Sequence, residues 1–434
     1  MKAEVNGLNE KVVKMLAERK MTVSAAESCT GGLFAALITN VSGASEVLNE
    51  SFVTYANSAK MKYLGVKGET LEKHGAVSYE TAFEMAEGLR KNTGADVTVG
   101  ITGIAGPTGG TKEKPVGLVY VGICVMGETE VKELHLNGTR EEVRECTCKI
   151  TFENIANRIE KKIKSELLLM LKNDREEYEK FWNNFGVQIK FGVYNEFGAH
   201  KELLQDLLLF YSSKERKLVT LDEYVNRMEE GQKDIYFVSG DKVEMMDELP
   251  IVKKVKDKGY EILYLTDNVD EFVLQTLMNY KEKNFKNISQ GDLDLDSEEE
   301  KKEKEKKAEE NKDLLKDLKE ALGEQVKEVK ISSRLVDDPV CLSSDEGMSF
   351  EMEKVLSAMP EGNPYGMKAT RILEINPNHP IFEALQNVYE NDKDGIKEYA
   401  ELLYNQALLI EGFPIENPVE FSRKICDFMV KAAK

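Results

Sequence analysis

Hydrophobic and polar residues in the first 155 positions alternate between helical and strand-like patterns. Segments with apolar residues every three or four positions predict helices, and short apolar runs between them predict strands. The predicted helices cover 8–20, 32–40 and 79–92, and the predicted strands cover 22–28, 51–57, 97–102, 117–126 and 130–136. Because the two kinds of element alternate, the sequence predicts an α/β domain with helices on both faces of a sheet.

The pattern after residue 155 is more helical and more charged. Residues 160–185 predict a strongly helical stretch, after which strands and helices mix again. The charge run at 296–322 is typical of a solvated helix or flexible linker, with an interaction tail as the alternative. Two amphipathic helices at the carboxyl end predict a contact between two copies of the protein, with packing onto their own domain as the alternative. Their apolar stripes are Ile396, Tyr399, Leu403, Ala407 and Ile410 in one helix, and Phe421, Ile425, Phe428 and Met429 in the other.

Length and composition divide the chain into parts. With 434 residues it exceeds the size at which a single core stops growing, about 250–300 residues, so two or three domains are expected. Eighteen of the 31 glycines precede Ile155. The net charge is −3 over 1–155 and −16 over the remainder, which together give −19. This shift predicts a domain boundary near residue 155.

The acidic balance excludes several classes of function. A net charge of −19 argues against a non-specific binder of nucleic acid or of anionic membranes, because both need a basic face. No apolar stretch reaches the roughly 18–20 residues that span a bilayer, and the amino end lacks the apolar core of a secretory signal. Six cysteines do not indicate a disulfide framework here, and Cys146 and Cys148 are expected to be helix positions rather than metal ligands. We therefore expect a soluble, cytoplasmic protein without a metal.

The segment AESCTGG (26–32) ends a predicted strand and begins a predicted helix. A side chain at such a junction lies at the positive end of the helix dipole, where unpaired amides can bind an oxyanion or a phosphate. Ser28 is therefore a candidate nucleophile, and Gly31 and Gly32 would let a substrate approach the backbone. The alternative is that Ser28 or Thr30 only caps the helix.

A serine nucleophile needs a base, and none of the four histidines lies in a recognisable triad motif. The G-x-S-x-G elbow and the S-x-x-K arrangement are both absent around Ser28. The next strand–helix junction, at 51–66, supplies Tyr55, Asn57 and Lys60, and parallel strands would bring the two junctions to one rim. Lys60 would act as a base if burial or a nearby cation lowers its pKa, and Tyr55 would relay the proton or hold the amine. The alternative is that Lys60 is a surface residue.

A glycine-rich loop, TGIAGPTGGTKEKPVG (102–117), follows the next predicted strand. Its backbone amides can donate to a phosphate or a ribose. It is not a Walker loop, because Thr111 stands before Lys112 where a glycine belongs, and it lacks G-x-G-x-x-G spacing. A tight turn that only connects two strands is the alternative.

The strand–helix junctions and the glycine-rich loop follow one another in an order that is found in a known family. The segments AESCTGG, VTYANSAKMKYLGV, HGAVSYETA and GITGIAGPTGGTKEKPVGLVYVG resemble the CinA carboxyl-terminal domain family, the nicotinamide-nucleotide amidases, over about residues 5–150. The resemblance implies an α/β/α layered domain that hydrolyses nicotinamide mononucleotide to nicotinate mononucleotide and ammonia, with no cofactor. The nucleotide-processing domain that often precedes this module is missing, so we expect only the amidase activity.

By motif match, the resemblance also implies roles for individual residues. Ser28 would be the nucleophile, with Lys60 and Tyr55 as its activating partners. The positions that would bind the substrate are Thr30, Gly31, Gly32, Asn57, Thr102, Gly103, Ala105, Gly106, Gly109 and Gly110.

The rest of the chain resembles the heat-shock protein 90 family, as in bacterial HtpG. Residues 173–272 are similar to part of its middle domain, and 333–385 to its carboxyl-terminal dimerisation domain, so about 156–434 are covered. We therefore expect an amidase domain at 1–155, a partial middle domain at 156–290, and a charged helix with the dimerisation domain at 291–434. The family's ATP-binding domain is not in this chain, so no ATPase activity is expected.

The second resemblance implies partners as well. It implies a homodimer through the carboxyl-terminal helices and unfolded protein clients at the Met/Phe surface of 343–360. Met348, Phe350 and Met352 suit core packing equally well. We expect Phe181, Trp182 and Phe185 to be exposed, because the middle domain is incomplete.

Three functional hypotheses follow. The first is an amidase joined to a chaperone remnant that dimerises it. The second is an ATP-independent, chaperone-like module that binds clients. The third is a chimeric gene product without a selected combined function, which sequencing the source gene across the codons for 145–165 would test.

Overall fold

The first part of the chain is built on a five-stranded sheet with the strand order β2-β1-β3-β4-β5. β1 pairs in parallel with β2 and β3, whereas β4 is antiparallel to both β3 and β5. Because β1, β2 and β3 run in the same direction, their carboxyl ends meet at one edge of the sheet. The strands are β1 (Val23–Glu27), β2 (Leu48–Val53), β3 (Val97–Gly103), β4 (Leu118–Val125) and β5 (Glu128–His135).

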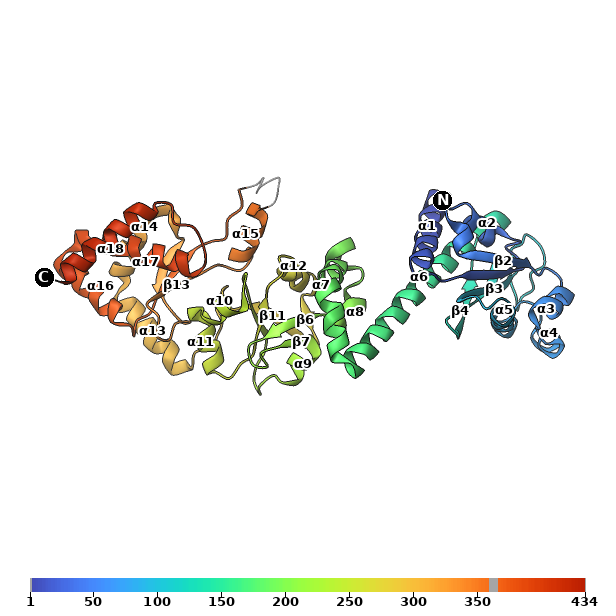
Figure 1. Ribbon diagram of the computed structural model, residues 1–434, viewed down its shortest axis with the longest axis horizontal. Coiled ribbons are helices and arrows are strands. Elements are labelled where there is room, and N and C mark those ends of the chain that lie inside the picture. The colour runs from blue at the N-terminus through green and yellow to red at the C-terminus, as the bar shows by residue number, and fades with distance from the viewer. Residues whose placement is uncertain (1, 359–365, 434) are drawn as a thin grey trace. The chain divides into compact units, whose positions relative to one another are not determined.

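Helices cover both faces of this sheet (Figure 1). On one face, α1, α2 and α6 pack against the strands in a core where Val12, Phe34 and Phe152 are fully buried. On the other face, α3 and α5 contribute a smaller cluster that contains Leu64 and Leu89. The predicted α/β/α layering is therefore confirmed. The helices are α1 (Lys2–Glu18), α2 (Leu33–Thr39), α3 (Asn57–Leu64), α4 (Gly68–His74), α5 (Tyr79–Thr93) and α6 (Arg140–Asn173).

Two glycines let α5 lie directly on the sheet. A Cβ atom at Gly100 in β3 would come within 2.8 Å of the Ala82 carbonyl oxygen, and one at Gly122 in β4 would come closer still to the same atom. Side chains do not tolerate such distances, so glycine is required where the helix and the strands approach most closely.

The computed structural model describes residues 2–358 and 366–433, and the chain separates into two compact units, Met1–Glu166 and Leu167–Lys434. The helix α6 begins in the first unit and ends in the second. Asp174 then caps the next helix, since its carboxylate accepts a hydrogen bond from the Glu177 amide at 3.1 Å. The helical stretch predicted over 160–185 is therefore confirmed, as two helices that this cap separates.

The second unit contains a six-stranded sheet with the order β10-β11-β8-β9-β6-β7. β8 is parallel to β9 and β11, and β6 is antiparallel to β7 and β9. The strands are β6 (Leu209–Ser212), β7 (Leu218–Thr220), β8 (Ile235–Ser239), β9 (Ile262–Leu265), β10 (Asn279–Tyr280) and β11 (Lys283–Asn287). The helices of this part are α7 (Arg175–Gly198), α8 (Lys201–Leu204), α9 (Leu221–Asn226), α10 (Val243–Asp247), α11 (Pro250–Asp257) and α12 (Asp270–Leu277).

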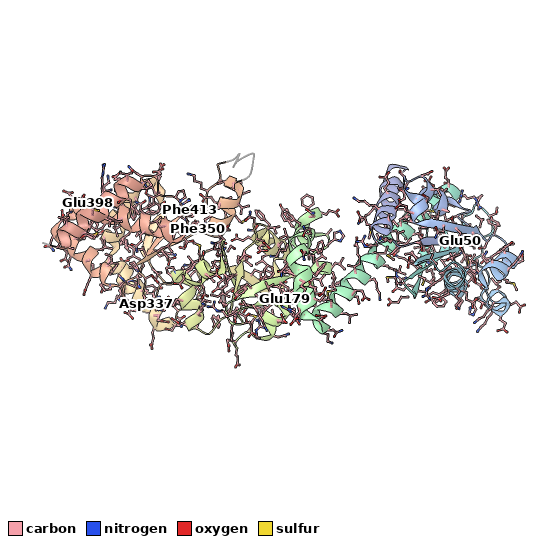
Figure 2. All side chains as sticks on the ribbon, in the orientation of Figure 1. Glu50, Glu179, Asp337, Phe350, Glu398 and Phe413 are labelled. Carbon is pink, nitrogen blue, oxygen red and sulfur yellow. The ribbon has the colours of Figure 1, made fainter. Side chains whose placement is uncertain are left out.

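A three-stranded sheet with the order β12-β14-β13 follows in the chain. Phe350 and Phe413 lie beside each other near it (Figure 2), with their ring centroids 5.6 Å apart and their planes at 89°. Phe350 is 4% exposed, so this residue packs in the core. The elements are β12 (Glu328–Ile331), β13 (Val340–Ser343), β14 (Ile372–Ile375), α13 (Glu298–Glu310), α14 (Lys312–Leu322), α15 (Phe350–Ala358), α16 (Pro380–Asn391), α17 (Ile396–Ile410) and α18 (Pro418–Ala432).

The structure corrects two expectations in the second unit. The charge run at 296–322 is not uniformly solvated, because α14 buries Leu314, Leu315, Leu318 and Leu322 in the core while α13 buries no residue. Trp182 was expected to be exposed, but it is 7% exposed, whereas Phe185 is 53% exposed. Helical spacing, rather than the incompleteness of the domain, decides which of these aromatic residues reach the solvent.

Candidate active site

Ser28 and Lys60 lie in direct contact at the edge of the first sheet. Lys60 Nζ donates a hydrogen bond to Ser28 Oγ at 3.1 Å, although the two residues are 32 positions apart. Ser28 directly follows β1, and Lys60 lies in α3, which begins shortly after β2. The two strand–helix junctions that were predicted to face each other are therefore adjacent. The Lys60 side chain is 1% exposed, so it is not a surface lysine.

Backbone carbonyl groups fix the amine of Lys60. Its Nζ also donates to the Thr54 carbonyl oxygen at 2.8 Å and to the Tyr55 carbonyl oxygen at 3.4 Å. The Thr54 amide in turn donates to the Glu27 carbonyl oxygen at 2.9 Å, which joins this segment to the end of β1. A neutral amine has two N–H groups and one lone pair. In its neutral form, with both N–H groups on these carbonyls, Lys60 would direct its lone pair at the Ser28 hydroxyl.

Burial sets the protonation of the groups beside Ser28. Desolvation lowers the pKa of Lys60 from its ordinary value, against an opposing effect of the nearby Cys29. Burial raises the pKa of Cys29 to about 11, because the thiolate would be poorly solvated. A thiol with such a pKa is a poor nucleophile at neutral pH. Of the two adjacent candidates, Ser28 has the better-placed base.

Tyr55 contributes its backbone rather than its phenol to this contact. Its carbonyl oxygen accepts from Lys60, but its side chain is 64% exposed. The phenol oxygen accepts from Arg140 Nη2 at 3.4 Å. The hydrogen bonds of the phenol therefore do not include Lys60, and a role for the phenol in proton transfer stays a prediction.

Side-chain hydrogen bonds fix the glycine-rich loop after β3. Thr102 Oγ1 donates to the Ala76 carbonyl oxygen at 2.6 Å. Lys114 Nζ donates to the carbonyl oxygen of His74, the last residue of α4, and to that of Val77 at 2.7 Å. Arg140 Nη1 donates to the Gly106 carbonyl oxygen at 2.8 Å. These bonds give the loop a defined position beyond that of a simple strand connection.

The amides at the start of α2 are not free, contrary to the expectation from the helix dipole. The Glu27 carboxylate accepts from the amides of Gly32 at 3.0 Å, Phe34 at 3.1 Å and Ala35 at 2.9 Å. The Leu33 amide donates to the Thr30 carbonyl oxygen at 3.2 Å. The first turn of α2 is therefore occupied, and this helix end does not offer its amides to a phosphate.

Two arginines near the site were missed by the sequence reasoning. Arg140 bridges Gly106 and Tyr55, as described above, and Arg144 donates to the Thr30 carbonyl oxygen from Nε at 3.1 Å and Nη2 at 2.6 Å. Both lie in the first turns of α6, more than 80 residues from the junctions they contact. Their spacing of four residues places them on one helix face, which is the only signal in the sequence.

The other predicted substrate-binding positions differ in exposure. Thr30, Thr102, Ala105 and Gly106 are buried, Gly32 and Gly103 are half-buried, and Gly31, Asn57, Gly109 and Gly110 are exposed. Gly31 has a φ of 60° and Gly109 a φ of 91°, which are left-handed conformations that favour glycine. Their contact with a substrate stays a prediction.

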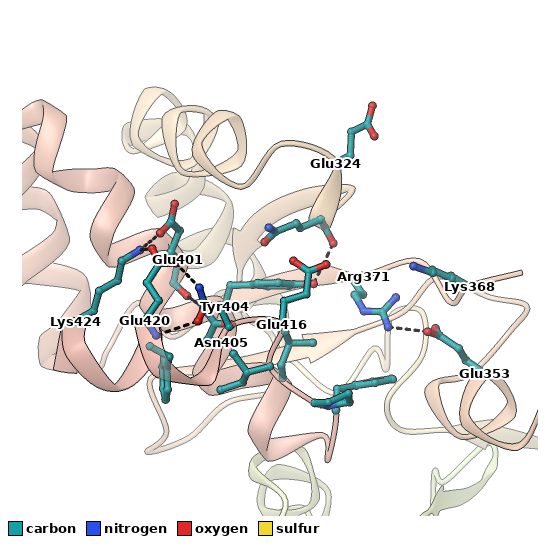
Figure 3. A pocket seen from close by; sticks show the side chains of 17 residues that line it. Glu324, Glu353, Lys368, Arg371, Glu401, Tyr404, Asn405, Glu416, Glu420 and Lys424 are labelled. Carbon is teal, nitrogen blue, oxygen red and sulfur yellow. Dashed lines mark hydrogen bonds and ion pairs between the residues drawn. The ribbon is translucent and has the colours of Figure 1, made fainter. Parts of the chain in front are cut away.

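A sizeable cavity lies elsewhere, in the second unit. Its volume is about 530 Å³, and Figure 3 shows that several of its charged side chains pair with each other. Arg371 binds Glu353 at 2.8 Å, and Lys424 binds Glu401 and Glu420. In the part of the chain that the structure describes, no group of three His, Cys, Asp or Glu side chains is suited to hold a metal. Among the described helices, none is both long and apolar enough to cross a membrane.

Comparisons with known proteins match the two parts of the chain to different families. Residues 5–159 match the CinA C-terminal domain, and residues 124–434 match the Hsp90 protein family. The two ranges overlap over 124–159, so the predicted domain limits at 155 and 290 stay a prediction.

Curated relatives of the second part are chaperone proteins named HtpG. The relative from Clostridium acetobutylicum is 54% identical over 305 residues, which is 70% of this chain and 48% of the relative. The relative from Bacillus subtilis is 51% identical over 306 residues, again 48% of its length. The chain therefore spans about half the length of these relatives.

Solved structures similar to the first part include the competence/damage inducible protein CihA from Agrobacterium tumefaciens. It is 40% identical and covers 36% of this chain and 94% of its own, with a TM-score of 0.35. A competence-damaged protein (CinA) superfamily protein from Escherichia coli is 30% identical, covering 36% of this chain and 91% of its own, with a TM-score of 0.35. The chain thus belongs to the Hsp90 family over residues 124–434 and carries a CinA C-terminal domain over residues 5–159.

Proposed function

We propose that the CinA-type domain hydrolyses the carboxamide of nicotinamide mononucleotide, giving nicotinate mononucleotide and ammonia. The observation that carries this proposal is the buried contact of 3.1 Å between Lys60 Nζ and Ser28 Oγ. A buried amine with a lowered pKa is suited to remove a proton from a serine hydroxyl. The CinA match over residues 5–159 supports the choice of substrate.

The reaction would proceed through an ester on Ser28. Ser28 Oγ attacks the carboxamide carbon while Lys60 Nζ takes its proton. The tetrahedral intermediate then collapses as Lys60 gives this proton to the leaving nitrogen, which departs as ammonia. In the second half, a water molecule attacks the ester while Lys60 accepts a proton from the water and returns it to Ser28 Oγ. The carbonyls of Thr54 and Tyr55 keep the amine in place throughout both halves.

Two negative charges need stabilisation in this reaction, the oxyanion of the tetrahedral intermediate and the phosphate of the substrate. The amides of Cys29 and Thr30 have no acceptor oxygen among the described residues, so they are candidates to stabilise the oxyanion. For the phosphate, the occupied end of α2 directs attention to Arg140, whose guanidinium is exposed beside the glycine-rich loop. A guanidinium suits a phosphate because it donates two parallel hydrogen bonds.

The test is an assay of ammonia release by the full chain from nicotinamide mononucleotide, beside nicotinamide riboside, which lacks the phosphate. We expect release from the mononucleotide, and slower release from the riboside because the anion contact is lost. Absence of ammonia with the mononucleotide would overturn the proposal. The alternative function, a client-binding module, predicts no ammonia release, but suppression of the aggregation of a heat-unfolded protein without nucleotide.

For the second part of the chain, we infer a homodimer that presents a chaperone-like surface to unfolded proteins. The helix α18 has no buried residue, and Val419, Met429 and Val430 are 61%, 66% and 56% exposed. By contrast, α17 buries its stripe in its own core, with Leu403 and Ala407 at 5% and 0% exposed. An uncovered apolar face on the last helix is suited to pair with the same face of a second copy.

Replacing Met429 with glutamate is therefore expected to convert the dimer to a monomer, because a carboxylate would be desolvated in the contact. Sedimentation velocity over a range of concentrations measures the change. Met245→Glu is the matched control, since Met245 is 59% exposed in α10 and should leave the dimer intact. A Met429→Glu variant that sediments like the wild-type dimer would contradict the inferred contact.

A further inference from the structure

Glu27 is a buried carboxylate directly before Ser28. It is the last residue of β1 and is 0% exposed. Its Oε2 accepts from the amides of Gly32 and Phe34, and its Oε1 accepts from the amide of Ala35. Among the described residues, Glu27 takes part in no ion pair, so these amides and the helix dipole are what compensate its charge.

Burying a carboxylate such as that of Glu27 costs more desolvation free energy than an ordinary helix cap does. Serine, threonine, asparagine and aspartate cap helices from the residue next to the first turn, usually with partial solvation. A fully buried carboxylate loses its hydration, and it is retained only where strong hydrogen bonds replace the water. Here a side chain from the preceding strand reaches across the turn 28–31 to α2, a seven-residue helix.

The turn that carries Ser28 is therefore held at both ends. On the strand side, the Ser28 amide donates to the Ile101 carbonyl oxygen at 2.9 Å, and the Glu27 carbonyl oxygen accepts from Thr54. On the helix side, the Glu27 carboxylate fixes Gly32, whose φ of 91° turns the chain into α2.

We infer that Glu27 is a positioning residue that holds the Ser28 hydroxyl against the Lys60 amine by fixing the turn between β1 and α2. The inference rests on the proposed function only in treating Ser28 and Lys60 as the reacting pair. A displacement of about 1 Å in such a pair can lower a rate by roughly 100-fold. Glu27 itself touches neither reacting atom, so its effect is on geometry.

The test replaces Glu27 with glutamine in the full chain. Glutamine has nearly the same shape, but only one of its two terminal groups accepts hydrogen bonds, so its NH₂ group would face an amide N–H. Glu84→Gln is the matched control, because Glu84 also caps a helix of this domain from another element, accepting from the Lys67 amide and the Thr70 hydroxyl, both at 2.8 Å. Thermal unfolding of both variants measures the structural cost of losing such a cap.

Two readouts separate positioning from stability. We expect Glu27→Gln to lower kcat for nicotinamide mononucleotide by about 10- to 100-fold with KM changed less than about threefold, and Glu84→Gln to retain wild-type kinetics. We also expect a fluorophosphonate probe, which reacts with activated serines, to label Ser28 more slowly in Glu27→Gln by a similar factor. The midpoint of the pH profile should stay at its wild-type value, because the Lys60 amine keeps its carbonyl partners.

The labelling makes the two proposals separable. If the wild-type protein is labelled at Ser28 but releases no ammonia, the substrate assignment fails while the effect of Glu27 is still measured. Equal labelling rates in the wild-type protein and Glu27→Gln would overturn the positioning role. If Glu27→Gln does not fold, Glu27→Asp decides: its carboxylate is drawn back by one methylene, and wild-type labelling in that variant would equally overturn the role.

Discussion

Replacing Lys60 with methionine is expected to lower kcat for the deamidation of nicotinamide mononucleotide by at least about 100-fold, because a positioned base contributes roughly 10²–10⁴ to such reactions. Methionine keeps most of the side-chain volume in a site that is 1% exposed, so the core should stay packed. It removes the amine whose Nζ lies 3.1 Å from Ser28 Oγ. Steady-state kinetics of ammonia release measures the loss, and circular dichroism checks the fold.

Lys62→Met is the matched control, since Lys62 is exposed two positions further along α3 and should keep wild-type activity. Ser28→Ala is expected to be at least as severe as Lys60→Met. Because the two side chains act as one unit, the double variant should be no slower than the slower single variant. Additive losses in the double variant would argue that Lys60 acts independently of Ser28.

The same pair gives the reaction a pH dependence with a defined sign. The base must be neutral, and burial lowers the pKa of Lys60 below the value of about 10.4 that is usual for lysine. We therefore expect kcat/KM to rise with pH and to level off at a midpoint below that of free lysine. A profile that falls as pH rises through this range would contradict a lysine base.

Replacing Arg334 with methionine is expected to destabilise the second unit by about 3–5 kcal/mol, because it removes the fully buried cation beside the Glu374 carboxylate, which then keeps the partly exposed Lys330 at 3.4 Å. Arg334 and Glu374 are both 0% exposed, and Arg334 Nε donates to Glu374 Oε1 at 3.0 Å. Arg334 Nη1 also donates to the Ile288 carbonyl oxygen, which follows β11. Urea unfolding followed by the fluorescence of Trp182, the only tryptophan, reports this unit.

An exposed ion pair supplies the control for Arg334. Lys327 and Asp345 lie 2.7 Å apart with 56% and 41% of their side chains exposed, so Lys327→Met should cost less than about 1 kcal/mol. The double variant Arg334→Met/Glu374→Gln should be more stable than Arg334→Met alone, because it also removes the buried negative charge that has lost its buried partner. If Arg334→Met has the same urea midpoint of unfolding as the wild-type protein, the Arg334–Glu374 pair does not stabilise the second unit.

The stability that the Arg334–Glu374 pair provides should also depend on pH. Burial acts to raise the pKa of Glu374, but Arg334, Lys330 and the Ser343 hydroxyl outweigh it, and the pKa lies below its usual value. A depressed pKa in the folded state means that the stabilisation is fully present above the unfolded value of about 4.3. It is lost as pH falls through the folded pKa. In Arg334→Met the deficit in stability should therefore shrink at acidic pH.

Much of the first unit was predictable from local patterns. The strand expected over 97–102 is β3 (Val97–Gly103), and the helix expected over 79–92 is α5 (Tyr79–Thr93). These elements carry continuous buried runs or helical stripes, which local spacing encodes. The strand expected over 51–57 was wrong beyond Val53, because residues 54–56 leave the sheet to hold Lys60 and α3 begins at Asn57. Pairing with β1, rather than β propensity, ended that strand.

The candidate site was predictable only in part. Motif resemblance assigned roles to Ser28 and Lys60, and their junctions were expected to face each other because parallel strands end at one rim. Glu27 was not singled out, since a buried carboxylate in a strand gives no local signal. Arg140 and Arg144 were missed for a different reason: the contact of Arg140 with Tyr55 spans 85 residues of the chain, and that of Arg144 with Thr30 spans 114.

By itself, the amino-acid sequence determined the layering of the first unit, the two family resemblances and the identity of the candidate nucleophile and base, because spacing and motif order are local properties of the chain. Only the tertiary structure decided that the Glu27 carboxylate accepts from the amides at the start of α2. It also decided that the Lys60 amine is buried and donates to two carbonyls, and that Arg334 forms a buried ion pair with Glu374. Those facts depend on which distant segments meet, since burial and desolvation arise only when separate elements pack together.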